Sequence, residues 1–236
     1  MSFTPDGSGI IITAGRFLRR WDLATDTLVI QWHILSTDCD HLMFSHDGSV
    51  FIVACNLAHG TGPPRVQLLH SDTLTEKTAL VGNPGRVTCL NFSPDSRFLA
   101  LGGSQGIVRI WNLKERSRSV AWRVGASVEA VSFSPDGTVA AVAAGEKLTL
   151  HDTDTQQQCG ELAGHTGVVR AVCFSPNGTL LSAGDDGVVR LWDVAARHER
   201  VVLDWKIGPI AAAAFSRYGL TAAIGGSKGL VVWDTE

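Results

Sequence analysis

The sequence has little of several features that mark particular protein classes. Only 18% of its 236 residues are charged, the net charge is −3, and no block of Lys and Arg occurs. Specific nucleic-acid binding usually leaves a basic stripe, so we expect no nucleic-acid partner. The chain also lacks an 18-residue apolar run and the apolar core of a signal peptide. We therefore expect a soluble chain with no membrane partner and no standard secretion signal.

Cysteines are few and irregularly spaced. The five cysteines are odd in number and show no Cys-x-x-Cys spacing; they are Cys39, Cys55, Cys89, Cys159 and Cys173. Disulfide frameworks and zinc sites both have more regular patterns. This composition indicates reduced core thiols in a cytosol-like compartment, so the predicted localisation is cytoplasmic.

Patterns that carry catalysis or bind a cofactor are also sparse. The sequence has no phosphate-binding loop, no paired catalytic carboxylates and no histidine pair with zinc spacing. Gly-x-Ser-x-Gly occurs at residues 102–106 and 225–229, but a hydrolase elbow leads into a helix, whereas both segments lead into a predicted strand. They are interpreted as β-turns. Residues 151–154, His-Asp-Thr-Asp, are interpreted as a repeat marker and a turn. We expect no catalytic residue, metal, cofactor or small-molecule substrate.

The abundant feature is a repeat. Phe-Ser-Pro-Asp-Gly, or a close variant, occurs six times, with phenylalanines 41, 48, 41, 41 and 41 residues apart. A Trp-Asp marker follows most copies, and His70 and His151 take the Trp position in two of them. A period near 40 residues indicates a repeat architecture. We expect one continuous array over residues 1–236, with repeats centred on residues 3–22, 44–72, 92–112, 133–152, 174–193 and 215–234.

Each repeat predicts a small antiparallel sheet. In the fifth copy, residues 168–174 are rich in β-branched side chains and read as a strand. Ser175-Pro-Asn-Gly178 has turn chemistry, and two further strands follow at residues 179–183 and 188–193. The linker to the next copy supplies a fourth strand. One such sheet cannot bury its own faces, so neighbouring sheets must stack.

With these marks in place, the chain resembles the WD-repeat family of β-propellers over essentially its whole length. The resemblance implies an all-β fold, a β-propeller of six WD-type blades that are four-stranded antiparallel sheets. The first and last blades are expected to be incomplete, since only Met1 and Ser2 precede the first Phe and the chain ends after a third strand. We expect an open or truncated ring. The alternatives are a six-bladed ring closed by packing alone and a piece of a longer polypeptide.

In the WD-repeat family a hydrogen-bonded tetrad often fastens a blade. Mapped onto this chain, the resemblance completes the tetrad once, with His165, Ser182, Asp186 and Trp192. Elsewhere it decays: Gln105 and Lys228 hold the Asp position, Asn83 holds a His position, and Ala100, Ala141 and Ala223 are assigned to the Ser position. The fifth blade is therefore predicted to be the most rigid.

Two groups of loop residues are candidates for recognition. The resemblance places mixed charge on the rim that commonly binds peptides or proteins, and the residues expected there are Asp38, Asp40, Arg86, Gln105, His165, Asp185 and Lys228. The second copy also carries an insertion loop that includes Asn56, His59 and Gly60. Long loops often carry recognition, but an insertion at a loop tip is also simply tolerated.

The leading hypothesis is a non-enzymatic protein-interaction scaffold that presents rim loops to a protein or peptide partner. The alternative is a regulatory or sensory propeller segment of a larger multidomain signalling protein. An enzyme that uses the propeller channel is a third hypothesis, but the inner strands offer mainly apolar residues there. Exposed strand edges also predict edge-mediated self-association.

Overall fold

A computed structural model describes residues 1–14, 17–33, 39–56, 65–80, 85–115 and 119–235. These residues form strands, turns and bends, with no helix among them, so this part of the chain has no helix that could cross a membrane. The contacts divide the chain into two compact units, Met1–Val87 and Thr88–Glu236.

The first unit contains two four-stranded antiparallel sheets whose strands pair in chain order. Its first strand has only two residues, as the short N-terminal lead predicts. The strands of the two sheets are β1 (Ser2–Phe3), β2 (Gly9–Ala14), β3 (Phe17–Asp22) and β4 (Thr27–His33), and then β5 (Cys39–Phe44), β6 (Val50–Cys55), β7 (Arg65–His70) and β8 (Glu76–Leu80).

The second unit contains four sheets, again in chain order, and the last has three strands. The strands are β9 (Val87–Phe92), β10 (Phe98–Gly103), β11 (Ile107–Asn112) and β12 (Ser119–Arg123); β13 (Val128–Phe133), β14 (Val139–Ala144), β15 (Lys147–Asp152) and β16 (Gln158–Leu162); β17 (Val169–Phe174), β18 (Leu180–Gly184), β19 (Val189–Asp193) and β20 (His198–Leu203); and β21 (Ile210–Phe215), β22 (Thr221–Gly226) and β23 (Gly229–Asp234). Among the described residues, the predicted all-β fold of six repeat sheets is confirmed, including the incomplete last sheet.

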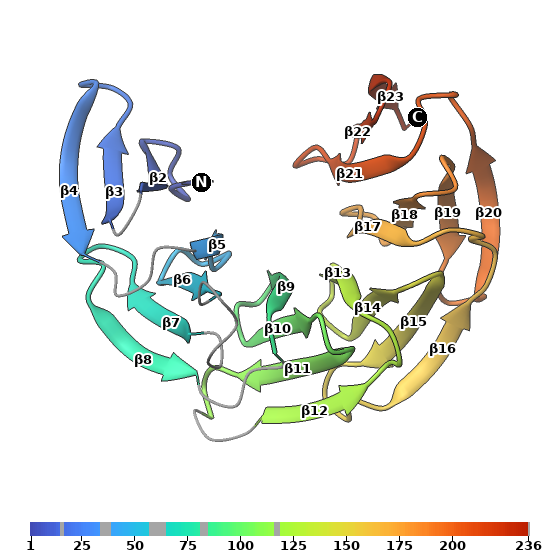
Figure 1. Cartoon of the computed structure of the whole chain (residues 1–236), viewed down its shortest axis with the longest axis horizontal. Coiled ribbons are helices and arrows are strands. Elements are labelled where there is room, and N and C mark those ends of the chain that lie inside the picture. Colours follow the sequence, from blue (N-terminus) through green and yellow to red (C-terminus); the bar gives the residue numbers. More distant parts are fainter. Residues whose placement is uncertain (15–16, 34–38, 57–64, 81–84, 116–118, 236) are drawn as a thin grey trace. The chain divides into compact units, whose positions relative to one another are not determined.

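Within the second unit the sheets stack face to face. The first strands β13 and β17 lie beside one another, and β16 and β20 run along the periphery (Figure 1). Ala141, Ala143 and Leu150 of the fourth sheet are buried against Leu180 and Trp192 of the fifth. The next pair of sheets repeats this arrangement through another buried cluster. Stacking therefore buries the faces that a single sheet would leave in water.

The repeated turn residues act as local caps. Ser93 and Ser134 accept backbone hydrogen bonds through Oγ from Phe98 and Val139 at 2.8 and 2.9 Å. At the Trp-Asp marker, the Asp152 carboxylate accepts hydrogen bonds from the Thr155 N–H at 2.7 Å and its hydroxyl at 2.6 Å. These short polar side chains replace backbone partners that a tight turn cannot supply.

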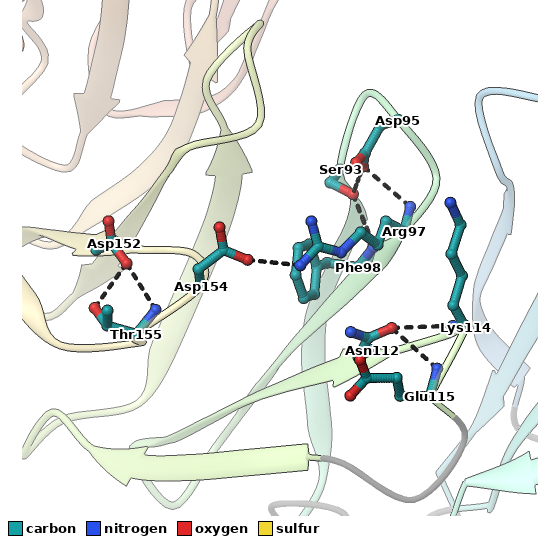
Figure 2. A network of polar contacts seen from close by, with 10 residues as sticks. All are labelled: Ser93, Asp95, Arg97, Phe98, Asn112, Lys114, Glu115, Asp152, Asp154 and Thr155. Carbon is teal, nitrogen blue, oxygen red and sulfur yellow. Dashed lines mark hydrogen bonds and ion pairs between the residues drawn. The ribbon is translucent and has the colours of Figure 1, made fainter.

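Figure 2 shows both kinds of turn at the junction of the third and fourth sheets. Arg97 follows the serine turn of the third sheet, and its Nη2 donates to Asp154 Oδ1 at 2.7 Å across the junction. The Arg97 guanidinium also lies 4.4 Å from the centre of the Phe98 ring. Both partners of the ion pair are partly exposed, so the pair orients the two turns and adds little stability.

The interpretation of all five cysteines as reduced thiols is wrong for one pair. Cys39 on β5 and Cys55 on β6 stand opposite one another and form a disulfide. Their sequence spacing gave no signal, because a cross-strand neighbour is set by the register of the hairpin. The pair therefore no longer supports a reducing compartment. Cys89 and Cys173 are free thiols, and burial raises the pKa of each to about 12.

Candidate partner-binding rim

The turns of each sheet lie along two opposite edges, across the ends of its strands, and the residues at these two edges differ in chemistry. Because strands pair antiparallel in chain order, the start of the first strand and the turn between the second and third strands meet at one edge. We call it the rim edge. The serine turn and the Trp-Asp turn meet at the opposite edge, the marker edge. The candidate recognition residues that the structure describes lie at rim edges.

In the fifth sheet the four tetrad residues form one hydrogen-bonded chain. Trp192 Nε1 donates to Ser182 Oγ at 2.8 Å, and Ser182 Oγ lies 2.7 Å from His165 Nε2. His165 Nδ1 lies 2.7 Å from Asp186 Oδ2. Trp can only donate, so the serine hydroxyl donates to Nε2 and the imidazole donates through Nδ1 to the carboxylate. The chain reaches from the buried Trp192 to the rim edge.

The His165 side chain is 1% exposed, and that of Asp186 is 7% exposed. Burial lowers the pKa of His165 below its ordinary value, although the hydrogen bond with Asp186 opposes this shift. The imidazole is therefore neutral near pH 7, which matches the single-tautomer arrangement. Asp186 Oδ2 also accepts from the Thr166 N–H at 3.2 Å, so the tetrad holds the loop before β17.

The assignment of alanines to the serine position in other repeats is wrong. Ser182 pairs with Arg190, two residues before the Trp of its marker, and Leu101, Val142 and Ile224 hold the corresponding positions. In the fifth sheet the Thr179 N–H donates to Ser175 Oγ, four residues earlier in the chain. The corresponding hydrogen bond to the turn serine spans five residues in the third, fourth and sixth sheets. A position counted from the repeat Phe in the fifth sheet therefore lies one residue away from the equivalent strand position in the other sheets. A shift of one residue places a strand side chain on the other face of the sheet.

A charged cluster lies directly beside the tetrad. Arg170 Nε and Nη2 bind the two oxygens of Asp185 at 3.0 and 2.8 Å, and Nη1 binds Glu129 Oε2 at 3.1 Å. Their side chains are 41%, 37% and 23% exposed. The hydrogen bond from Arg170 lowers the pKa of Asp185, and the same bond raises that of Arg170. This cluster, Glu129–Arg170–Asp185, spans the fourth and fifth sheets.

Sequence reasoning found Asp185 but missed Glu129 and Arg170. Both occupy the second position of the first strand in their repeats, 41 residues apart. The repeat period itself could have paired them, because equal positions in stacked sheets become neighbours. Opposite charges one period apart are therefore the signal to seek.

The first unit carries a second rim cluster. Asn56 is buried; its Nδ2 donates to Asp40 Oδ2 at 2.7 Å and to the Val87 carbonyl at 2.9 Å, and its Oδ1 accepts from the Val87 N–H at 2.8 Å. Arg86 Nη2 lies 3.1 Å from the same Asp40 oxygen. Val87 also contacts His41 Nε2 through its carbonyl at 3.2 Å, and burial lowers the pKa of that histidine. The cluster Asp40–Asn56–Arg86 is thus anchored to backbone.

The other candidates are dispersed. Gln105 and Lys228 are exposed in turns at rim edges, and in the described part of the chain no hydrogen bond or ion pair joins them to either cluster. Asp38, Asn83, His59 and Gly60 lie outside the described residues. Of the insertion-loop candidates, only Asn56 is described, and its side chain hydrogen-bonds Asp40 of β5 and Val87 of β9.

The other motifs singled out in the sequence have local partners. His151 Nε2 lies 3.1 Å from Thr149 Oγ1, Asp152 caps its own turn, and Asp154 pairs with Arg97. Among the described residues no group of three or more His, Cys, Asp or Glu side chains could hold a metal ion. Gly102–Gly106 and Gly225–Gly229 connect strands to strands.

Two segments of the chain, residues 74–112 and 156–193, match the family model "WD domain, G-beta repeat". Each match runs from the outer strand of one sheet through three strands of the next. The sequence repeat is therefore offset by one strand from the structural sheet.

Several curated proteins are similar over parts of their length. The small ribosomal subunit protein RACK1 of Schizosaccharomyces pombe is 30% identical over 91 residues, covering 39% of this chain and 29% of that protein. Human apoptotic protease-activating factor 1 is 30% identical over 136 residues, covering 51% and 11%. Protein groucho of Drosophila melanogaster is 28% identical over 141 residues, covering 58% and 18%. The matches thus span less than a third of each relative.

Proposed function

Because this chain is a WD-repeat protein, we propose that it is a non-enzymatic module that binds a protein or peptide partner through its rim edges. The observation that carries the proposal is the Glu129–Arg170–Asp185 cluster. It places both signs of charge in a fixed, partly exposed geometry across two sheets. The similarity to WD-repeat proteins adds support, and a cytoplasmic site of action is part of the proposal.

The physical basis of binding is preorganisation. The tetrad fixes Asp186 next to Asp185, and the bidentate contact with Asp185 fixes the Arg170 fork. Exposed ion pairs contribute only about 0–1 kcal/mol to folding each, so the cluster has little value for stability. Its oriented groups keep free lone pairs and N–H donors at the surface. A partner that meets them loses less conformational entropy than one that must order loops.

The test uses peptides selected from a random display library against the purified chain. Arg170→Glu should weaken binding of a selected peptide at least about tenfold, because it reverses the central charge. The matched control is Arg200→Glu, an exposed arginine on β20 of the same sheet, which should bind like the wild type. Equal binding by all three proteins would reject the rim cluster as the site.

The second candidate function is regulation within a larger signalling protein. It is favoured by the relatives, since the matched segments cover 11% of human apoptotic protease-activating factor 1 and 18% of groucho. This candidate predicts that neighbouring sequence from a longer polypeptide stabilises the chain. Limited proteolysis of a longer form compared with the 236-residue chain would decide, and equal resistance would count against it.

A further inference from the structure

The second unit holds a pocket at the marker edge, between the fourth and fifth sheets. Its volume is about 670 Å³, which lies within the usual range of ligand-binding pockets. The serine turns of both sheets and the Trp-Asp turn of the fifth sheet line it. Leu150 and Trp192 also line it, and both belong to the buried cluster that packs the two sheets together. We call this site the marker pocket.

Several apolar side chains are left partly open in the marker pocket. Val139, Phe174 and Val194 line it and pack on the buried cluster, yet each is only partly buried. Pro135 and Pro176, the prolines of the two serine turns, also line it and are exposed. An apolar group placed here would remove these surfaces from water, which is favourable. The pocket therefore suits an occupant with a bulky apolar side chain.

The preceding junction carries an ion pair at the equivalent place. There, Arg97 follows the serine turn of the third sheet and binds Asp154 in the Trp-Asp turn of the fourth (Figure 2). The N–H groups of Arg97 and Thr138 each donate to the aspartate of their own serine turn at 3.0 Å, so these two residues are equivalent. Asp154 and Ala195 each lie two residues after a marker aspartate. Thr138 and Ala195 both line the marker pocket, and they cannot form such a pair.

A cation reaches the marker pocket from the opposite side of the junction. Arg197 lies in the Trp-Asp turn of the fifth sheet, and its side chain lies against Gly160 on β16 of the fourth sheet. A Cβ atom at Gly160 would come within 3.2 Å of Arg197 Nε, so the glycine makes room for the arginine. Arg197 is exposed and makes no hydrogen bond or ion pair with any residue that the structure describes. Its guanidinium can therefore bind an anion.

The other charged groups of the marker pocket are already engaged. Asp136 Oδ1 accepts from an N–H and a hydroxyl of its own turn at 3.0 and 2.9 Å, and Asp193 Oδ1 accepts from the Ala196 N–H at 2.9 Å. The Ala196 hydrogen bond lowers the pKa of Asp193, and the charge of Arg200 adds to this shift. Arg200 is thus attracted to Asp193. Arg197 is the charged residue of the pocket that has no such partner among the described residues.

We propose that the marker pocket binds an acidic peptide segment of a partner protein. A bulky side chain of the peptide packs on the open apolar side chains, and a neighbouring carboxylate pairs with the Arg197 guanidinium. The pair of Arg97 and Asp154 shows this arrangement at the preceding junction, where a turn of the chain itself supplies the carboxylate. At the marker pocket the partner supplies it. The site lies at the opposite edge of the sheets from the rim clusters, so it does not depend on the proposed rim function.

The test measures how a peptide protects Cys159, a partly buried free thiol that lines the pocket. Iodoacetamide should label Cys159 first, because burial raises the pKa of Cys89 and Cys173 to about 12. The probe is the peptide Gly-Glu-Phe-Glu-Gly with both ends blocked, and mass spectrometry follows labelling at each cysteine. In excess, the peptide should slow labelling of Cys159 at least about threefold. Peptides with Gln in place of Glu, or with Gly in place of Phe, should leave the rate unchanged.

Variants of the intact chain assign the protection to the pocket. Arg197→Gln should remove it, because this change takes away the cation. Thr138→Arg combined with Ala195→Asp installs the ion pair of the preceding junction and should also exclude the peptide. The matched control is Arg123→Gln, since Arg123 is exposed on β12 outside the pocket, and it should protect like the wild type. Each variant is compared with itself without peptide, and circular dichroism establishes that it is folded.

Three outcomes would overturn the proposal. The first is equal labelling rates with all three peptides, whether slowed or not. The second is full protection in Arg197→Gln. The third is loss of protection in Arg170→Glu, because the rim cluster would then be the site of the peptide. Protection that Arg170→Glu leaves unchanged supports the marker pocket, whatever the outcome for binding at the rim.

Discussion

At the residue scale, the tetrad shows how one buried polar chain depends on all its members. Every donor in the chain from Trp192 to Asp186 has an acceptor. In a low-dielectric setting the loss of one member leaves its neighbour unpaired, which costs about 1–3 kcal/mol. The other described sheets have apolar residues at the serine position. They therefore carry no polar group there that could be left unpaired, and they also lack the hydrogen-bonded tetrad.

We predict that Asp186→Ala lowers the free energy of unfolding by about 1–3 kcal/mol, because it leaves the His165 Nδ1–H and the Thr166 N–H without an acceptor. Gln105→Ala alters an exposed turn residue at a rim edge and should change it by less than about 0.5 kcal/mol. Urea titration followed by tryptophan fluorescence measures both. Equal effects would contradict the structural role assigned to the tetrad.

The pH dependence of stability also has a residue-scale origin. His151 is 3% exposed, and burial lowers its pKa to about 4 from an ordinary 6.5. The unfolded chain therefore binds a proton between these values while the folded chain does not. The stabilisation from a neutral His151 is complete above pH 6.5 and is lost as the pH falls toward 4. Burial of His165 acts in the same direction.

We predict that the wild type loses stability between pH 6.5 and 4, with His151 contributing up to about 1.4 kcal/mol per pH unit. His151→Phe keeps an aromatic ring against Trp122, whose ring centre lies 4.6 Å from that of His151. The variant should show a shallower slope over this range. Urea titrations at several pH values test this, and an unchanged slope would show that other groups dominate.

At the element scale, the turns that close the strands carry most of the repeat signature. In the third and fourth copies the serine and aspartate of the motif hydrogen-bond within their own turns, so their first role is to cap the turn. The motif is visible in the sequence because the turn between two strands depends on the residue types at a few consecutive positions.

The marker turn of the fourth sheet supplies a matched pair of variants (Figure 2). Asp152→Ala removes an acceptor of two short hydrogen bonds within the turn and should cost about 1 kcal/mol. Asp154→Ala removes only an exposed ion pair with Arg97 and should cost less than about 0.5 kcal/mol. Thermal unfolding of both variants checks the order. A larger loss for Asp154→Ala would mean that the bridge between the sheets matters more than the cap.

At the scale of the whole molecule, the sequence repeat is offset by one strand from the structural sheet, so one repeat joins two neighbouring sheets through the backbone. The matched segment 156–193 begins in β16 of the fourth sheet and ends in β19 of the fifth. The matched segment thus supplies strands to two sheets, so each sheet depends on residues from two successive repeats. The same stacking brings Glu129 and Arg170 together across one period.

The sequence by itself determined the all-β class, the six repeats, the turns and the four tetrad residues, because each depends on residue types at fixed short spacings. The tertiary structure decided which side chains share a face. One residue fewer in the serine turn of the fifth sheet shifted the register, so the alanines assigned to the serine position lie on the opposite face. It also decided the Cys39–Cys55 disulfide and the Arg170 cluster. Each of these depends on strand pairing or sheet stacking, and a strand that slips by a single residue exchanges its two faces.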